Sequence, residues 1–419
     1  MQDPSPRPHV AYVMTHYPRP ALTFIALEMR ELERMGGRVT PIAVNVPSAE
    51  DLGTDEMRRA ERATSYLKAQ GVVTLAASFL RTCVRHPREM AALVRLAIMS
   101  ARLDLPLAAR RLVHLAYACW AWRAVADRGV RHFHAHFGQT PATVAWFAAS
   151  VGSFSSGERC TWSFTIHGFQ DFADERVTRF DLKVRSASFV ACVSDFTRAQ
   201  LCRVTDPDSW DRFHIVRCGI ELDAFPFRPP QPPRGPARVV TVARLSPEKG
   251  HLVLLAALRR LRDQGIDVEL RIIGDGPSAT LIERTAASLG LADRVALVGE
   301  LEPRLVASEL AEADIFCLPS FAEGIPVSIM EAMAVGLPVV TTFVGGIPEL
   351  AVDDQTALVV PASNAGELAG AILRLVEDDD LRTRLAEAAR RLVAQRHDVR
   401  PNVELLRELF ANLPTAQGR

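Results

Sequence analysis

The sequence lacks any segment that would cross a membrane or direct secretion. Apolar residues make up 48% of its 419 residues, yet no apolar run approaches the roughly 18 residues that a membrane-spanning helix requires. The first eight residues include three prolines and no apolar stretch, so no secretory signal is predicted. We therefore expect a cytoplasmic protein, with two or three domains at roughly 150 residues each.

Cysteine is scarce, and its pattern predicts no pairing. The seven cysteines are scattered along the chain, and none belongs to a C-x-x-C motif. Their odd number and irregular spacing argue against a disulfide framework and against a zinc site. We expect most of them to be small apolar residues of the core.

Several catalytic and nucleotide-binding signatures are also missing. The sequence has no G-x-S-x-G, no H-E-x-x-H and no phosphate-binding P-loop. No G-x-G-x-x-G follows the first predicted strand, which argues against a nicotinamide dehydrogenase. The acidic runs Asp353-Asp354 and Asp378–Asp380 fall in predicted surface turns, so no convincing D-x-D motif for a metal-bridged nucleotide is present. We expect neither a metal ion nor a bound cofactor.

Charge is balanced in total but unevenly distributed. Residues 57–131 hold 14 basic and 4 acidic residues in a chain of zero formal charge. This excess suggests an anionic partner for the N-terminal half. The helix-rich segment 57–130 leaves two interpretations open: a basic amphipathic surface on an anionic membrane, or helices packed on the sheet with a solvated basic face. Nucleic acid is not an expected partner.

Strand and helix signals alternate along the N-terminal half. Short apolar runs bounded by turn residues predict strands, and a helix is predicted at Glu28–Met35 before Gly36-Gly37. This alternation predicts an α/β fold with a parallel sheet covered on both faces. The predicted strands of this half are Val10–Met14, Arg38–Val46, Arg131–Ala135, Trp162–Ile166 and Phe189–Val193.

A proline-rich stretch divides the chain into two such halves. Residues 225–236 contain six prolines, which cannot continue a helix or a central strand. We predict an N-terminal domain at 1–225, a linker at 226–236, a second αβ domain at 237–400 and a helical tail at 401–419. Two facing halves joined by a stiff hinge would form a cleft at the carboxyl ends of their strands. The elements predicted in the second half are strands Val239–Val242, Val268–Ile273, Val295–Val298, Ile315–Leu318, Val339–Thr342 and Ala357–Val360, with helices Leu252–Arg262, Ser278–Leu289 and Val327–Ala334.

The strongest motif of the second half pairs two carboxylates. Glu323 lies in a loop after a predicted strand, and Glu331 lies eight residues later on the following helix. Gly324 permits close approach of a ligand to the backbone, and Pro326 suits a first helical turn. The N–H groups of that turn favour an anion. Glu331 can then accept hydrogen bonds from two vicinal hydroxyls, such as those of a ribose, while Glu323 contacts a sugar. The plainer alternative is a solvated loop carboxylate and a helix-face carboxylate.

Two further motifs follow predicted strands of the same half. Arg244 and Lys249 come directly after Val239–Val242 and together suit a diphosphate, because Arg offers a planar donor fork and Lys a mobile point charge. Gly274 and Gly276 follow the next strand and permit a tight turn. For this second pair, a structural turn and a ligand contact remain equally open.

Histidines mark the strand ends of the N-terminal half. His167, followed by Gly168, comes after Trp162–Ile166, where it can point into a cleft. A structural role is the commoner one for a lone histidine. His134 and His136 alternate on one strand, so both face the same side. We favour a packing or substrate-wall role for them, because the third ligand that a metal site needs is not apparent.

The motifs of the second half resemble those of the retaining glycosyltransferases of family 4, which have the GT-B fold of two facing Rossmann-like domains. The N-terminal half is similar to a narrower group, the bacterial exopolysaccharide or colanic-acid-type transferases. That similarity rests on Tyr17-Pro18, on Thr23 to Glu28, on His134 to Phe137 and on Phe164 to Gly168. Ala21-Leu22 stands where that group usually has Ser-Glu. The second half carries, in order, Arg244 with Glu248-Lys249-Gly250, Gly274-Asp275-Gly276-Pro277, Arg294 with Gly299, Glu323-Gly324 with Glu331, Pro338 with Thr342, and Gly345 to Glu349.

The resemblance implies a role for each matching residue. Arg244 and Lys249 would bind the diphosphate and stabilise the leaving group, Glu323 would hold the donor sugar, and His167 would lie near the reacting sugar. Glu331 would hold the ribose. The implied nucleotide-sugar contacts are Gly274, Gly276, Val298, Gly299, Gly324, Ile325, Pro326, Val327 and Glu331.

The function so implied is transfer of a sugar, with retention, from a nucleotide-diphosphate sugar to a glycan or a polyprenyl-diphosphate-linked glycan of the cell surface. The enzyme would act in the cytoplasm, with association at the inner membrane face left open. A non-catalytic sugar-nucleotide-binding or scaffold subunit of a polysaccharide assembly complex is the alternative from another class. An epimerase or a phosphorylase on the same fold is the enzymatic rival.

Overall fold

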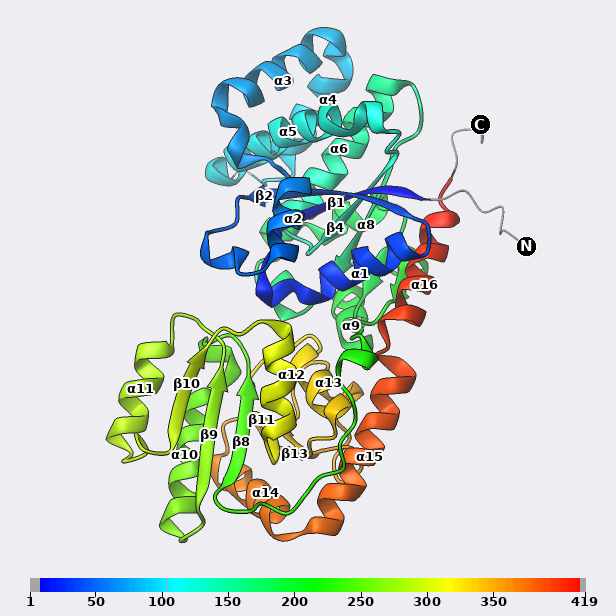
Figure 1. Ribbon diagram of the computed structural model, residues 1–419. Helices are drawn as coiled ribbons and strands as arrows, with labels where there is room; N and C mark the ends of the chain where they lie inside the picture. Colours follow the sequence, from blue (N-terminus) through cyan, green and yellow to red (C-terminus); the bar gives the residue numbers. More distant parts are fainter. Residues whose placement is uncertain (1–7, 103, 415–419) are drawn as a thin grey trace, which may run out of the picture. The chain divides into compact units, whose positions relative to one another are not determined.

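The computed structural model describes residues 8–102 and 104–414 and divides into two compact units. The first unit comprises the residues up to Val216 together with those from Val403 onward, and the second comprises Arg217–Asn402. The division falls ahead of the proline-rich stretch 226–236, which belongs to the second unit. Figure 1 follows the chain through both units by colour.

A seven-stranded parallel sheet forms the centre of the first unit (Figure 1). Its strand order is β3-β2-β1-β4-β5-β6-β7, so the chain starts in the middle, builds one edge and then returns to build the other. In a sheet of this order, ligands bind beyond the carboxyl ends of the strands near the reversal between β1 and β4. The strands are β1 (His9–His16), β2 (Arg38–Asn45), β3 (Ser65–Tyr66), β4 (His132–His136), β5 (Thr161–Ile166), β6 (Val190–Cys192) and β7 (Phe213–Ile215).

Helices cover this sheet in layers. Helix α6 packs on β4 and β5, α5 packs on α6, and α3 and α4 pack on α5. Every residue of β4 and β5 is buried, as expected for central parallel strands covered on both faces. The prediction that segment 57–130 is helix-rich is confirmed. The helices are α1 (Thr23–Arg34), α2 (Asp55–Ala63), α3 (Gly71–Arg85), α4 (Pro87–Met99), α5 (Leu105–Val125), α6 (Thr140–Ser156), α7 (Glu175–Thr178), α8 (Phe180–Ser186) and α9 (Asp195–Val204).

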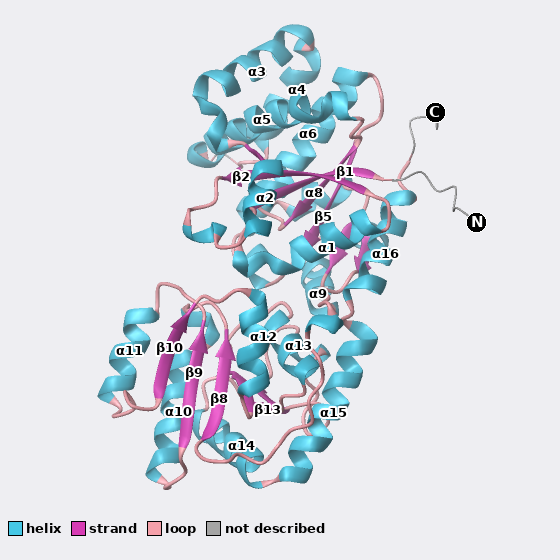
Figure 2. Ribbon diagram, in the orientation of Figure 1, coloured by secondary structure: helices cyan, strands magenta, loops and turns pink. Residues whose placement is uncertain are grey.

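A six-stranded parallel sheet, in the order β10-β9-β8-β11-β12-β13, forms the centre of the second unit (Figure 2). Helix α10 packs against α11 and α14, while α13 packs against α12 and α15. The strands are β8 (Ala237–Val242), β9 (Val268–Ile273), β10 (Val295–Gly299), β11 (Ile315–Leu318), β12 (Val339–Thr342) and β13 (Leu358–Val360). The helices are α10 (His251–Asp263), α11 (Ala279–Ser288), α12 (Pro303–Glu312), α13 (Val327–Val335), α14 (Ala365–Glu377), α15 (Asp379–Arg396) and α16 (Val399–Ala411).

The last helix, α16, begins in the second unit and ends in the first. Phe410 near its end is 4% exposed and lies among the rings of Tyr12, His132, His134 and Phe189. Its centroid is 5.3 Å from that of His134 and 5.6 Å from that of Phe189. The C-terminal segment therefore completes the core of the first unit.

The predicted elements largely coincide with those observed. The strands at 268–273, 315–318 and 339–342 have the predicted bounds, and the other predicted strands differ by one to three residues in total. Strands β3 and β7 and helix α12 are among the elements that were not predicted. The first two have two and three residues, which is too short for a periodic pattern. Helix α12 begins at Pro303 and buries Val306 and Leu310, a pair one turn apart.

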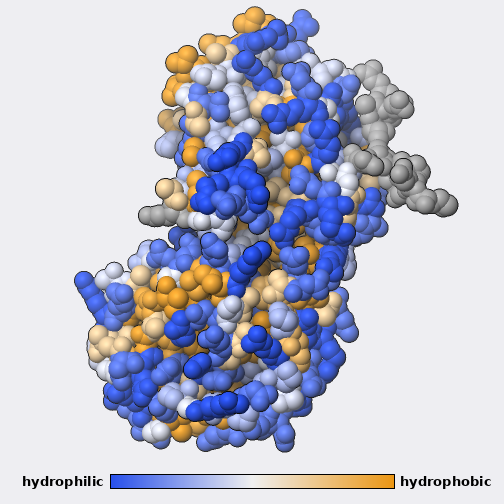
Figure 3. Space-filling view, in the orientation of Figure 1, coloured by the Kyte–Doolittle hydropathy of each residue, from blue (hydrophilic) through white to orange (hydrophobic). Residues whose placement is uncertain are grey.

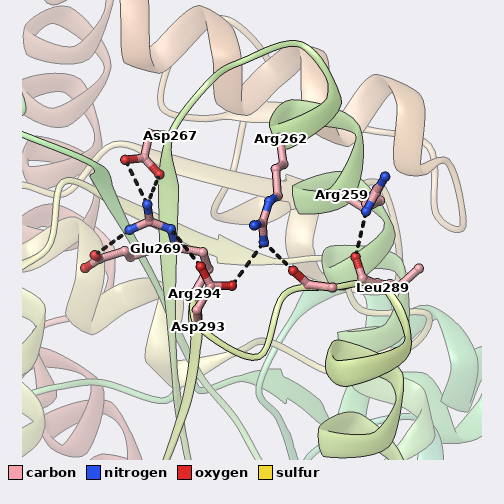
Figure 4. Close-up of polar contacts among 8 residues, drawn as sticks. Arg259, Arg262, Asp267, Glu269, Leu289, Asp293 and Arg294 are labelled. Carbon is pink, nitrogen blue, oxygen red and sulfur yellow. Dashed lines mark hydrogen bonds and ion pairs between the residues drawn. The ribbon is translucent and has the colours of Figure 1, made fainter.

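An arginine cluster fixes the amino ends of β9 and β10. Arg294, directly before β10, forms ion pairs with Asp267 at 2.9 Å and Glu269 at 3.2 Å (Figure 4). Arg262 on α10 reaches Asp293 at 3.0 Å. Arg294, part of the family pattern, thus lies at the edge of the sheet opposite to the carboxyl ends of the strands. Its contacts in the described residues are structural.

The proline-rich stretch contains no helix or strand and runs along the second unit. The N–H of Arg228 donates to the carbonyl of Val335 at the end of α13, at 2.8 Å. Arg390 on α15 donates to the carbonyls of Phe225 and Ala334 at 2.9 and 2.8 Å. The stretch is therefore anchored to α13 and α15.

Two further properties concern the chain as a whole. All seven cysteines are free thiols, and four of them are buried. Across the described ranges, no helix combines the length and the apolar character needed to cross a bilayer.

Candidate functional site

In the second unit, the loops that follow β8, β11 and β12 contact one another through glycines. Gly250 has φ +70°, and a Cβ there would lie 2.0 Å from the carbonyl oxygen of Pro319. Gly345 has φ +56°, and a Cβ there would lie 1.9 Å from the carbonyl oxygen of Glu323. Only glycine fits both the left-handed backbone and the contact. These close approaches fix the loops that carry the predicted site residues.

An ion pair joins two of the predicted catalytic residues. Lys249 Nζ lies 2.7 Å from Glu323 Oε1, although 74 residues separate them in sequence. The hydroxyl of Ser320 donates to the same carboxylate oxygen at 2.7 Å. Glu323 is 7% exposed, and the side chain of Lys249 is 20% exposed. Two donors therefore hold the carboxylate of Glu323 in place, while the ammonium group of Lys249 is accessible.

The backbone around this pair is held by hydrogen bonds between the loops. The N–H of Phe321 donates to the carbonyl of Glu248 at 2.7 Å. The hydroxyl of Thr342, at the end of β12, donates to the carbonyl of Ser320 at 2.6 Å. Ser320 was not singled out from the sequence. The motif Ser320-x-x-Glu323 after a strand is the signal that could have identified it.

Arg244 begins the same β8 loop. Its side chain is exposed, and no hydrogen bond or ion pair joins it to any residue in the described part of the chain. The carboxylate of the neighbouring Glu248 accepts a hydrogen bond from the hydroxyl of Ser246 at 2.7 Å. Arg244 is therefore a solvated cation at the carboxyl edge of the sheet, close in sequence to Lys249.

Helix α13 begins within the glutamate motif, as predicted. Pro326 is its N-cap, and Val327 is its first residue. The first N–H groups of a helix have no intrahelical partners, and they carry partial positive charge. Gly324, Ile325 and Pro326 are buried, while Val327 is partly exposed.

Glu331 lies one turn into α13 and is partly exposed. Its carboxylate has no hydrogen-bond partner among the residues that the structure describes. Desolvation by the surrounding protein raises the pKa of Glu331 to about 7. A carboxylate kept without a partner in such a place is available for ligand hydroxyl groups, as its predicted role requires.

The glycine motif after β9 forms a tight turn against the β8 loop. The N–H of Gly274 donates to the carbonyl of Gly299 at 2.8 Å, and the N–H of Leu245 donates to the carbonyl of Asp275 at 2.9 Å. A Cβ on Gly276 would lie 2.5 Å from the carbonyl oxygen of Leu245. These contacts give Gly274 and Gly276 a structural role. Val298 and Gly299, at the end of β10, are partly exposed.

In the first unit, the carboxyl ends of β4 and β5 carry a row of hydrogen-bonded groups. His167 Nε2 lies 3.0 Å from His136 Nδ1. His136 Nε2 lies 3.3 Å from Glu28 Oε1 on α1. The hydroxyl of Tyr12, on β1, donates to the same oxygen at 2.7 Å. These histidines were predicted from the sequence, whereas the continuation of the row through Glu28 and Tyr12 was not.

The structure shows how His134 is used. Its Nδ1 lies 2.7 Å from the hydroxyl of Ser163, and its Nε2 lies 2.9 Å from the hydroxyl of Thr165. His134, His136 and Glu28 offer ligand atoms within 4.8 Å of one another. Both ring nitrogens of His134 are thus engaged by hydroxyl groups of β5, which gives His134 a packing role.

Asp171 and Lys183 support the same edge and were not predicted. The buried carboxylate of Asp171 accepts from the N–H of Gly138 at 2.7 Å and from the N–H of His167 at 3.0 Å. Burial raises the pKa of Asp171 to about 6. Lys183 Nζ, fully buried, donates to the carbonyls of Gly138 and Gln139. These two side chains fix the backbone from which His167 projects.

Comparisons with known proteins agree with this picture. Residues 225–392 match the family model of the glycosyl transferases group 1. The chain is 36% identical over 191 residues to the putative colanic acid biosynthesis glycosyltransferase WcaL of Escherichia coli K12, covering 44% of this chain and 47% of that protein. It is 39% identical over 175 residues to the amylovoran biosynthesis glycosyltransferase AmsK of Erwinia amylovora, covering 40% and 43%. The matches thus span about half the length of these relatives.

Solved structures match nearly the whole chain. Anabaena Alr3699/HepE in complex with UDP and glucose has a TM-score of 0.73 at 17% identity, covering 97% of this chain and 100% of that one. Sucrose-phosphate synthase from Thermosynechococcus elongatus has a TM-score of 0.72 at 21% identity, with the same coverage. The predicted α/β class, with two Rossmann-like units of the GT-B type, is confirmed.

Proposed function

We propose that this chain is a glycosyltransferase that takes a sugar from a nucleotide-diphosphate donor, because residues 225–392 match the family model of the glycosyl transferases group 1. The observation that carries the proposal is the ion pair of Lys249 with Glu323, held by Ser320 where the β8 and β11 loops meet. A cation fixed at the carboxyl edge of a parallel sheet, close to the start of a helix, suits a pyrophosphate. The fold shared with a protein solved with UDP and glucose supports the same donor class.

In this proposal the donor is held by three kinds of group. Lys249 and Arg244 neutralise the diphosphate, together with the N–H groups at the start of α13. Glu331 accepts hydrogen bonds from the two ribose hydroxyls, and Val298 with Gly299 lines the base pocket. Glu323 has one carboxylate oxygen engaged by Lys249 and Ser320, and its other oxygen meets the donor sugar.

The proposed reaction retains the anomeric configuration through front-face attack. The acceptor hydroxyl approaches on the side of the leaving diphosphate, whose phosphate oxygen takes the hydroxyl proton. The barrier falls because the reactants are positioned and because Lys249 and Arg244 stabilise the charge on the departing diphosphate. Metal independence is part of the proposal, since two cations and a helix start supply the positive charge.

The proposed acceptor is a glycan, free or linked to a polyprenyl diphosphate. The relatives named for colanic acid and amylovoran biosynthesis support a role in making an exopolysaccharide. A lipid-linked acceptor would place the reaction at a membrane surface, and the first unit has a surface suited to it.

The outer face of α3 is apolar although it is exposed. Val72, Val73, Leu80 and Val84 are 83%, 82%, 60% and 82% exposed. Val72, Leu80 and Val84 share one side of the helix, because they are spaced by multiples of four residues. Figure 3 shows this hydrophobic surface over α3 at the upper end of the first unit.

Basic side chains border this apolar stripe. Arg81, Arg85, Arg88 and Arg95 on α3 and α4 are exposed, and no ion pair joins them to other residues that the structure describes. Glu89 is the single acidic residue of the two helices. An amphipathic surface of this composition suits anionic lipid headgroups. We therefore place peripheral association with an anionic membrane on α3 and α4.

A donor screen tests the function directly. Thermal shifts with UDP-, GDP-, dTDP- and ADP-sugars should identify one base through stabilisation of the protein. Turnover of that donor in the presence of EDTA, with the anomeric configuration of the product read by NMR, then tests catalysis, metal independence and retention. Donor binding without hydrolysis or transfer would favour the non-catalytic subunit instead.

A further inference from the structure

The turn that follows β4 contains a strained residue. Phe137 has φ +73°, in the left-handed region that bulky side chains rarely adopt. Its N–H donates to the carbonyl of Thr165 on β5 at 3.0 Å, and its ring centroid lies 4.6 Å from that of His167. Phe137 and His167 are both partly exposed and directly follow β4 and β5. A strained backbone persists only where the surrounding structure holds it, and such positions cluster at functional sites.

A single carboxylate bridges the turn after β4 and the loop after β5. Asp171 Oδ1 accepts from the N–H of Gly138 at 2.7 Å, and Oδ2 accepts from the N–H of His167 at 3.0 Å. The N–H of Asp171 donates to the carbonyl of Gly168 at 3.1 Å, which fixes Asp171 within its own loop. Asp171 is 1% exposed, and its pKa of about 6 leaves it mostly ionised at neutral pH, so both oxygens act as acceptors. The turn and the loop therefore cannot separate without breaking one of these hydrogen bonds.

Lys183, on α8, holds the carbonyl groups of the same turn. Its Nζ donates to the carbonyl of Gly138 at 2.5 Å and to that of Gln139 at 3.1 Å. The side chain is fully buried and interacts electrostatically with Asp171. Burying two ionisable groups costs free energy, and an apolar pair in their place would often be as stable. Asp171 and Lys183 thus contribute mainly the geometry of the turn.

We propose that Asp171 and Lys183 are positioning residues of the transfer reaction, which lock the turn after β4 onto the loop after β5 so that Phe137 and His167 meet the substrate as one fixed surface. This inference rests on the proposed function for the identity of that substrate, whereas the lock itself does not depend on it. Both positioning residues are buried, so they act on the substrate through the backbone that they hold. The residues proposed to bind the donor lie in the second unit, so loss of the lock should affect turnover far more than donor binding.

Amide hydrogen exchange in the full-length protein, followed by mass spectrometry, tests the lock without any substrate. Asp171→Asn is nearly isosteric but turns an amide NH₂ toward one of the two backbone donors, so one hydrogen bond is lost. The N–H groups of Gly138 and His167 should then exchange at least about tenfold faster than in wild type. Lys183→Met removes the donors of the lysine at similar length and should also speed exchange at Gly138. The control Asp127→Asn removes an exposed carboxylate of the same unit and should leave these rates unchanged.

Turnover of the donor found in the screen is the second readout. Asp171→Asn and Lys183→Met should each lower kcat by about 10- to 100-fold, as loss of a group that orients reacting residues does elsewhere. The donor KM and the thermal shift with the donor should stay within about twofold of wild type, and Asp127→Asn should retain wild-type kcat.

The two readouts separate the possible outcomes. Unchanged exchange at Gly138 and His167 in Asp171→Asn would overturn the lock. Faster exchange with an unchanged kcat would give Asp171 a purely structural role and overturn its part in the reaction. If Asp171→Asn does not fold, Lys183→Met decides by the same two measurements. If no donor is turned over, the proposed function fails, while the exchange rates still show whether the lock exists.

Discussion

At the scale of single residues, the cations of the β8 loop carry the strongest expectation. In the proposed mechanism, Lys249→Ala and Arg244→Ala each remove positive charge that stabilises the departing diphosphate. We expect each to lower kcat by about 10²- to 10³-fold, the usual cost of losing one group that stabilises charge in the transition state. Arg260→Ala, which removes an exposed cation from α10 of the same unit, should stay near wild-type turnover. Near-normal kcat in Lys249→Ala would remove Lys249 from the mechanism.

The raised pKa of Glu331 leads to two predictions, one for the stability of the protein and one for donor affinity, as functions of pH. Its pKa of about 7 exceeds its ordinary value, so the folded protein binds more protons than the unfolded chain between pH 4.5 and 7. The free energy of unfolding should therefore fall, through this group, as pH rises across that window. Glu331→Gln removes this term and should be more stable than wild type at pH 8 by about 1–3 kcal/mol in denaturant unfolding. Equal stabilities at pH 8 would show that Glu331 is well solvated.

Nucleotide binding should show the opposite dependence on pH. In the proposed donor complex, an ionised Glu331 accepts from both ribose hydroxyls, so donor affinity should rise as pH increases from 6 to 8. In Glu331→Gln the affinity should be weaker at pH 8 and nearly constant across that range. Calorimetric titration with the donor from the screen measures both variants.

At the scale of elements, α3 has an exposed apolar stripe that can be tested for membrane binding. Leu80→Asp places a charge in the middle of the apolar stripe at an exposed position, so folding should be unaffected. We expect binding to phosphatidylglycerol vesicles to weaken at least about tenfold, since loss of one buried leucine costs more than 1.4 kcal/mol. Leu281→Asp, an exposed leucine of α11 in the second unit, is the matched control.

Salt and lipid composition complete that test. If arginines beside the stripe contribute, binding should fall as ionic strength rises and should be weak on phosphatidylcholine vesicles. If the wild-type protein co-sedimented equally with vesicles of both lipids, the surface of α3 and α4 would not be specific for anionic membranes.

The elements also show how far sequence reasoning reached. Strand β11 was predicted to the residue because Ile315–Leu318 is a continuous apolar run. Strand β9 was predicted to the residue because apolar residues alternate with Glu269 and Arg271 before two isoleucines. Edge strands β3 and β7 gave no such signal, since so few of their residues pair. At the site, two separate sequence motifs predicted Lys249 and Glu323. Their ion pair forms because the loops after β8 and β11 meet, and a local sequence pattern does not show such a contact. The same holds for Glu28 and His136.

At the scale of the whole molecule, the second unit is one continuous stretch of chain. A fragment of residues 217–402 contains its complete sheet and core, so we expect it to fold alone. It should retain a thermal shift with the donor nucleotide but show no transfer, because His167 lies in the first unit. The same fragment with Lys249→Ala should lose most of the shift. A fragment that fails to unfold cooperatively would show that the second unit depends on the first.

The first unit, in contrast, is interrupted: its chain leaves after Val216 and returns only at Val403. During synthesis on the ribosome, the second unit is therefore complete before the first can acquire Phe410 and the rest of its closing helix. Until α16 has emerged, the rings around His134 and Phe189 lack their contacts with Phe410. Emergence of α16 is thus the event that allows the core of the first unit to be completed.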